Sequence, residues 1–142
     1  MKKRIYFLLA IVSAIATAFA FTESILQNQN EKIVGVWIPD ESGYDYRIEV
    51  SEDGIWKEYY NKGQTFTSYE YTIESNPECS VTVPVEPGLY YIKLTEKPGP
   101  LEQVSEPLEL CYELDIVSDE RLSLILIGGA SYQPTTFKRF KL

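Results

Sequence analysis

The sequence predicts an all-β protein, an up-and-down antiparallel β-barrel of about eight to nine strands. Apolar and polar residues alternate with a period of two along most of the chain, and short turn-forming segments separate these runs. Gly35-Val36-Trp37 opens the strand pattern and Phe137-Lys138-Arg139 closes it. A barrel can plug one end with an indole from its first strand, over which a guanidinium from its last strand stacks. We therefore expect Trp37 at the floor of the barrel, with Lys138 or Arg139 as its cap.

Residues 1–20 differ in composition from the rest of the chain. Residues 2–4 are positively charged, an apolar run follows from residue 5 to residue 16, and Ala18-Phe19-Ala20 fits the small-x-small rule for signal peptidase. The apolar run is shorter than the roughly 20 residues that an uncleaved membrane anchor needs. We expect a cleaved signal peptide at 1–20, an N-terminal lead-in at 21–32 and the barrel domain at 33–142. The mature protein is then exported, periplasmic or secreted, without membrane insertion.

The first half of the domain predicts a hairpin followed by a meander. Residues 46–50 alternate, residues 51–54 supply a turn, and a second strand returns at 55–60. If Gly54 takes the left-handed position of a three-residue loop, Val50 faces Trp56, and Glu58 points inward on the same side. Further strands are expected at 65–74, at 80–85 and around 90–94.

The second half predicts a long loop, another hairpin and a last strand. Residues 97–107 hold three of the eight prolines, so this segment cannot continue a ladder and is expected to be the longest loop, a rim or lid over one barrel end. A turn at 117–121 joins a strand at 108–117 to its return at 122–127, and the last strand lies near 135–140. The apolar residues expected to face inward from the first of these strands are Leu108, Leu110, Tyr112, Leu114 and Ile116.

Cys79 and Cys111 are the two cysteines of the chain. Export would favour a disulfide between them, which would tie the turn-forming segment before Cys79 to the strand that contains Cys111. Closing a loop of this length contributes about 3 to 4 kcal/mol in the chain-entropy model. The CxxC spacing of redox pairs is missing, so we expect a structural bridge.

Composition argues against several functions. The chain has 13 Lys plus Arg against 21 Asp plus Glu, and nucleic acids and anionic membranes are bound largely through basic clusters; a cationic protein remains open as a partner. There is no histidine, which removes the common catalytic triads and the usual transition-metal ligands. The acidic residues Glu109, Glu113 and Asp115 read as the solvated face of a strand. We therefore expect no enzyme activity, no catalytic residue, no metal site and no cofactor.

Aromatic residues dominate the face that should point inward. An eight-stranded barrel is just wide enough either to fill with side chains or to leave one cavity, and both outcomes stay open. In a cavity, tyrosine hydroxyls and Glu58 would orient a small apolar or aromatic ligand, because few other polar groups face inward. An inward Glu58 must be hydrated, paired or protonated. The candidate ligand-binding residues are Tyr46, Trp56, Glu58, Tyr60, Tyr69, Tyr71, Tyr90 and Tyr112.

The order and spacing of these segments resemble exported bacterial lipocalin-like proteins. The resemblance rests on Gly35-Val36-Trp37, the hairpin at 50–56, the strand pair at 112–124 and the terminal Phe137-Lys138-Arg139. It implies a calycin barrel with Trp37 as its floor residue and Lys138 or Arg139 as the cap. The chain is shorter than typical lipocalins, and the sequence predicts no helix of the kind that flanks their barrel.

Two functions stay open at this stage. The first is binding of a small apolar or aromatic ligand inside the barrel. The alternative is a protein-interaction or inhibitor module that acts through an acidic rim or loop. Periplasmic lysozyme inhibitors share the size, a disulfide and an acidic surface, and their glycine-rich loop is similar to residues 128–132, although this loop lacks their lysine.

Overall fold

The computed structural model describes residues 27–41, 45–82, 86–99, 106–130 and 132–141. The expected signal peptide lies outside these ranges. No helix within them is both long and apolar enough to cross a membrane.

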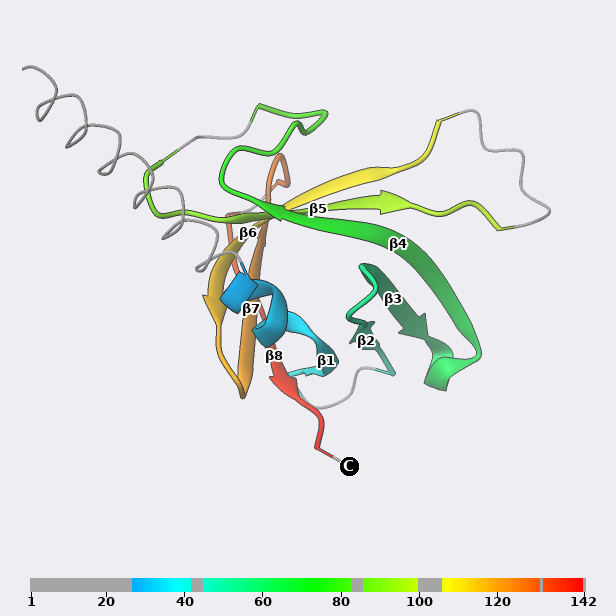
Figure 1. Ribbon diagram of the computed structural model, residues 1–142. Helices are drawn as coiled ribbons and strands as arrows, with labels where there is room; N and C mark the ends of the chain where they lie inside the picture. The colour runs from blue at the N-terminus through cyan, green and yellow to red at the C-terminus, as the bar shows by residue number, and fades with distance from the viewer. Residues whose placement is uncertain (1–26, 42–44, 83–85, 100–105, 131, 142) are drawn as a thin grey trace, which may run out of the picture.

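Eight antiparallel strands form a closed barrel in chain order, and β8 pairs with β1 to complete it (Figure 1). The predicted all-β, up-and-down barrel is therefore confirmed. Short connections join most neighbouring strands, and a 3₁₀ turn, η1 (Asn61–Gly63), links β3 to β4. The strands are β1 (Gly35–Pro39), β2 (Arg47–Val50), β3 (Ile55–Tyr60), β4 (Thr65–Glu74), β5 (Tyr91–Glu96), β6 (Glu109–Val117), β7 (Arg121–Leu126) and β8 (Thr135–Arg139).

A short helix at residues 27–33 closes the end of the barrel where β1 begins, in the segment expected to be a loose lead-in (Figure 1). Ile33, its last residue, is fully buried, and the Trp37 indole N–H donates to the Ile33 carbonyl oxygen at 2.7 Å. The Arg139 guanidinium carbon lies 4.3 Å from the centre of the Trp37 ring. Arg139 is therefore the cap, whereas Lys138 is exposed because it points to the opposite face of β8.

The β2–β3 hairpin forms as the sequence predicts. Gly54 has φ +81°, the left-handed conformation that this turn requires, and the Ser51 N–H donates to the Ile55 carbonyl oxygen at 2.9 Å. Val50 pairs with Trp56 and Ile48 pairs with Glu58. Trp56 and Glu58 therefore point into the barrel, as expected.

The Cys79–Cys111 disulfide is present, with the two Cα atoms 6.3 Å apart. Cys111 points to the outer face of β6, where it packs with Tyr91 and Ile127 in a small cluster separate from the barrel core. The bridge draws the chain around Cys79 over this outer face, so the strand predicted at 80–85 is wrong for residues 80–82, which form no strand. Residues 83–85 of that prediction lie outside the described ranges.

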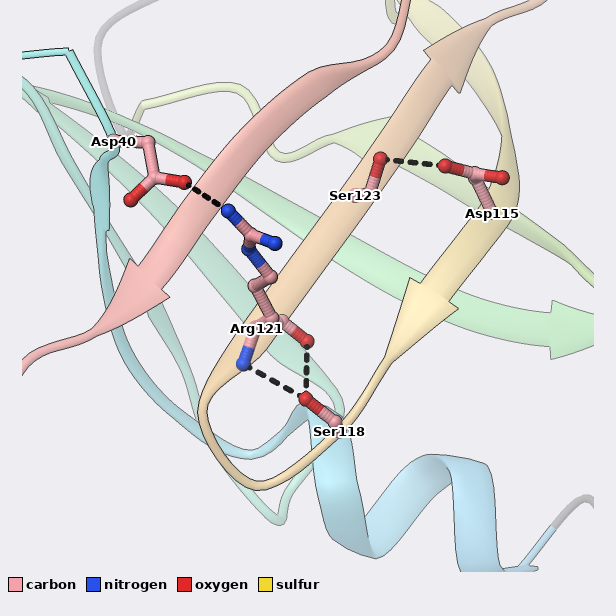
Figure 2. Close-up of polar contacts among 5 residues, drawn as sticks. All are labelled: Asp40, Asp115, Ser118, Arg121 and Ser123. Atoms are coloured by element: carbon pink, nitrogen blue, oxygen red, sulfur yellow. Dashed lines mark hydrogen bonds and ion pairs between the residues drawn. The ribbon is translucent and has the colours of Figure 1, made fainter.

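A β-bulge between Leu114 and Ile116 changes which residues of β6 face inward. The extra residue, Asp115, accepts a hydrogen bond from the Ser123 hydroxyl at 2.8 Å on the outer face (Figure 2). Beyond the bulge Val117 packs on the core and Ile116 is exposed, so the inward prediction for Ile116 is wrong. Leu108, which lies before β6, is exposed as well.

The connections also differ from the expected ones at one point. The link between β4 and β5, residues 75–90, is longer than the link between β5 and β6, residues 97–108, which was expected to be the longest loop. The β6–β7 turn forms as predicted. In it the Ser118 hydroxyl accepts from the Arg121 N–H at 2.9 Å and donates to the Arg121 carbonyl oxygen at 3.2 Å (Figure 2).

Candidate ligand-binding site

The two ends of the barrel are built differently. Because each strand reverses direction, the described parts of the connections at 40–46, 61–64, 97–108 and 127–134 lie at the end opposite to the helix at 27–33. We call this end the mouth. The other end, closed by Trp37 and Arg139, is the helix end.

Glu58 lies at the centre of the candidate site, on the inner face of β3. Its side chain is 8% exposed. One carboxylate oxygen accepts from the Trp56 indole N–H at 3.1 Å, and the other accepts from the Tyr60 hydroxyl at 2.5 Å. No lysine or arginine of the described residues forms a salt bridge with it. The structure therefore shows an arrangement other than the three expected for an inward carboxylate, because the Glu58 oxygens are hydrogen-bonded to neutral donors.

Four tyrosines surround this carboxylate. Burial raises the pKa of Tyr69 and Tyr112 to about 12, and the negative charge of Glu58 adds to the shift. Burial also raises the pKa of Tyr46 and Tyr60 well above the usual range, followed by the charge of Glu58 for Tyr46 and the hydrogen bond to Glu58 for Tyr60. All four are therefore neutral hydroxyls at neutral pH. We call Tyr46, Glu58, Tyr60, Tyr69 and Tyr112 the tyrosine–glutamate cluster.

The structure brings together six of the eight predicted ligand-binding residues. Trp56 is buried beside the tyrosine–glutamate cluster, which holds the other five. Tyr71 instead lies towards the helix end, where its hydroxyl donates to the Ser51 carbonyl oxygen at 3.3 Å. Tyr90 packs on the core, and its carbonyl oxygen accepts from the Leu114 N–H. These two residues face inward as predicted, but they do not join the cluster.

Sequence reasoning missed one charged neighbour of the cluster. Glu96, the last residue of β5, pairs in register with Tyr69, and its negative charge contributes to the raised pKa of the Tyr69 hydroxyl. Glu96 follows Ile92 and Leu94 at the spacing of two that places residues on one face. Extending that alternation by one step would have identified it.

A hollow of about 580 Å³ opens at the mouth, where β1 ends and β8 begins. Tyr46 borders it, and the Tyr46 ring centre lies 5.2 Å from that of Tyr60 and 6.2 Å from that of Phe137. Tyr46 thus lines the hollow and also lies near Glu58, whose negative charge contributes to the raised pKa of the Tyr46 hydroxyl. The residues that line the hollow are Pro39, Asp40, Glu41, Tyr46, Pro134, Thr135, Thr136 and Phe137.

The two carboxylates that line this mouth hollow differ in their partners. Asp40 forms a salt bridge of 3.0 Å with Arg121, which crosses β8 on the outer face of the barrel (Figure 2). Glu41 has no salt-bridge partner among the described residues. The negative charge of Glu41 is therefore available to a molecule in the hollow.

A second hollow of about 1020 Å³ lies at the helix end, between the short helix and the far part of β4. Its lining includes Glu31, Glu52 and Glu74, and none of the described residues that line it is lysine or arginine. It is a wide surface groove and makes no contact with Glu58 through its lining residues. The residues that line it are Gln27, Asn30, Glu31, Val34, Glu52, Gly54, Tyr71, Thr72, Ile73 and Glu74.

The mouth therefore combines one buried carboxylate, several hydroxyl donors and aromatic ring faces beside an open hollow. A few polar groups among aromatic walls are typical of sites that hold a small molecule in one orientation.

No cluster of three or more metal-ligating side chains occurs within the described ranges. Protein-family models, curated proteins and solved structures were compared with this chain, and none of them matches it.

Proposed function

We propose that this protein is an exported, non-enzymatic β-barrel that binds a small apolar or aromatic molecule at its mouth. The observation that carries the proposal is the buried Glu58, hydrogen-bonded to Trp56 and Tyr60 and next to Tyr46, which lines an open hollow. A carboxylate is costly to bury, and apolar side chains of similar size would pack a barrel core at lower cost. A role in recognition accounts for its presence on this inner face.

Two further features support the proposal. The disulfide favours an oxidising compartment, which agrees with export after cleavage of the expected signal peptide at 1–20. The arrangement of Trp37 under Arg139 at one end, with an open mouth at the other, is similar to that of the lipocalin-like carriers that the sequence resembles. In such a barrel the closed end stabilises the fold and the mouth is free to vary.

Native mass spectrometry of the protein purified from its own host tests the proposal. A bound molecule of low mass should be present in the wild-type protein. Its occupancy should change in the Glu58→Gln variant, which keeps the shape of the side chain and removes its charge. Recovery of the wild-type chain with no small molecule, together with a retained protein partner, would contradict ligand binding.

The groove at the helix end favours a second candidate function, that of an interaction module for a cationic protein segment. Glu31, Glu52 and Glu74 line it with no lysine or arginine among the other described lining residues, so its surface attracts positive charge. Pull-down from host extract with the wild-type protein and with Glu74→Lys tests this function. Loss of a partner in Glu74→Lys, while Glu58→Gln retains it, would favour the interaction module over the carrier.

A further inference from the structure

We infer that the molecule bound at the mouth is an organic cation, an ammonium group carried on an apolar or aromatic body, with its charge held against the Tyr46 ring between Glu58 and Glu41. This inference rests on the proposed function and names its ligand class. Three features of the mouth support it: a buried carboxylate with no salt bridge among the described residues, the ring of Tyr46 and a second carboxylate in the lining of the hollow.

The first feature is the electrostatic state of Glu58. Its partners in hydrogen bonds, Trp56 and Tyr60, are neutral donors that satisfy its oxygens without cancelling its charge. Glu96, also near Tyr69, adds a second negative charge to the same region. The interior at the mouth is therefore negative, and attraction between unlike charges is strengthened where water is excluded. A bound cation would neutralise this charge, whereas an anion would be repelled.

The second feature is the ring of Tyr46. Tyr46 lines the hollow and lies close enough to Glu58 for the charge of that carboxylate to add to burial in raising the pKa of its hydroxyl. Cations bind to the faces of aromatic rings by attraction to the electron density of the ring, and ammonium ligands are recognised by clusters of such rings. Phe137, 6.2 Å from Tyr46 between ring centres, supplies a further ring at the same hollow.

The third feature is the outer wall of the hollow. Glu41 lines it with no described salt-bridge partner, and the apolar Pro39 and Pro134 line it as well. A cation in the hollow would therefore have the negative charges of Glu41 and Glu58 near its ammonium group and apolar surface for its body. The volume of about 580 Å³ is in the range of pockets that hold a small organic molecule.

The test uses three probes that share a phenyl ring on a two-carbon chain and differ in charge. They are phenethylammonium, which is positive, phenethyl alcohol, which is neutral, and phenylacetate, which is negative. Their affinities for the mature chain are measured by isothermal titration calorimetry at neutral pH and physiological salt, where general surface attraction is screened. Phenethylammonium should bind about tenfold or more tightly than the alcohol, and phenylacetate should bind least.

Two variants assign this preference to the mouth. Glu58→Gln and Tyr46→Leu should each reduce the difference between phenethylammonium and the alcohol to about threefold or less. Glu120→Gln removes the same charge at an exposed position of the helix end, so it should retain the full preference. Thermal unfolding of each variant shows that it is folded, and the two mouth variants serve as alternatives if one of them is not.

The first three of the following outcomes bear on the inference alone, and the last bears on the proposed function too. Equal affinity of the wild-type protein for the alcohol and the ammonium overturns the cation inference and leaves ligand binding at the mouth intact. A preference that survives in a folded Glu58→Gln and a folded Tyr46→Leu also overturns the inference, as does its loss in Glu120→Gln. Binding of none of the three probes overturns the inference and counts against the proposed function as well.

Discussion

Replacement of Trp37 by alanine tests how the helix end of the barrel is closed. Trp37 is fully buried, and substitution of a buried aromatic residue by alanine costs about 3 to 5 kcal/mol in free energy of unfolding. The change also removes the donor to the Ile33 carbonyl oxygen, worth about 1 kcal/mol, and the ring under Arg139, worth about 0.5 to 2 kcal/mol. These contacts overlap with burial, so we expect a total loss of about 3 to 5 kcal/mol.

Urea unfolding measures this loss directly, with the fluorescence of Trp56 as the remaining tryptophan signal. Tyr132→Ala is a suitable control because Tyr132 is 62% exposed, and its stability should stay within about 0.5 kcal/mol of the wild type. If Trp37→Ala loses less than about 1 kcal/mol, then closure of the barrel does not depend on the indole and the account of the helix end is refuted.

Three further predictions follow from single features of the structure. Titration of unfolded, unreduced protein should find no free thiol, and two titratable thiols would contradict the bridge. The double variant with Cys79→Ser and Cys111→Ser should have a free energy of unfolding about 2 to 4 kcal/mol lower than the wild type. Gly35→Ala should lower the free energy of unfolding by about 1 to 3 kcal/mol in urea unfolding. The reason is that Gly35 has φ +145° and that a Cβ at this position would lie 2.2 Å from the Arg139 guanidinium. An unchanged urea midpoint would show that this contact relaxes freely. The pKa of Tyr69 and Tyr112 is raised to about 12 in the folded state, so the folded state keeps protons that the unfolded state releases near pH 10. The free energy of unfolding should therefore be constant below about pH 10 and fall between about pH 10 and 12. Tyrosinate absorbance that rises fully by about pH 10 in the folded protein would contradict this prediction.

The parts of the fold that the sequence predicts correctly are those set by local chemistry. The β2–β3 hairpin follows from Gly54 and the alternation on either side of it, and the strand at 65–74 matches β4 in full. Closure at the helix end follows from pairing β1 with β8, which brings Trp37 opposite Arg139. Adjacent residues of a strand point to opposite faces, so this pairing alone selects Arg139 over Lys138.

The incorrect parts depend on contacts between distant residues. The segment at 80–82 has the alternation of a strand, but the bridge from Cys79 to the outer face of β6 holds it over the sheet. The bulge at Asp115 reverses the faces of the residues that follow it, and its partner, Ser123, comes from the neighbouring strand. Neither feature changes the local pattern of the sequence, so a period of two predicts the wrong position for Ile116.

The candidate site shows the same limit in a different form. Alternation predicts which face of the sheet a residue occupies, but the height of that residue along the barrel depends on register, which the sequence does not display. β4 has 10 residues and β3 has 6, so the far part of β4 passes the β2–β3 turn and carries Tyr71 to the helix end. Tyr69, two residues earlier, pairs with Trp56 and stays beside Glu58. Register therefore divides one row of inward tyrosines into a group around Glu58 at the mouth and a structural residue at the helix end, and substitutions at Tyr69 and Tyr71 should affect binding and stability differently.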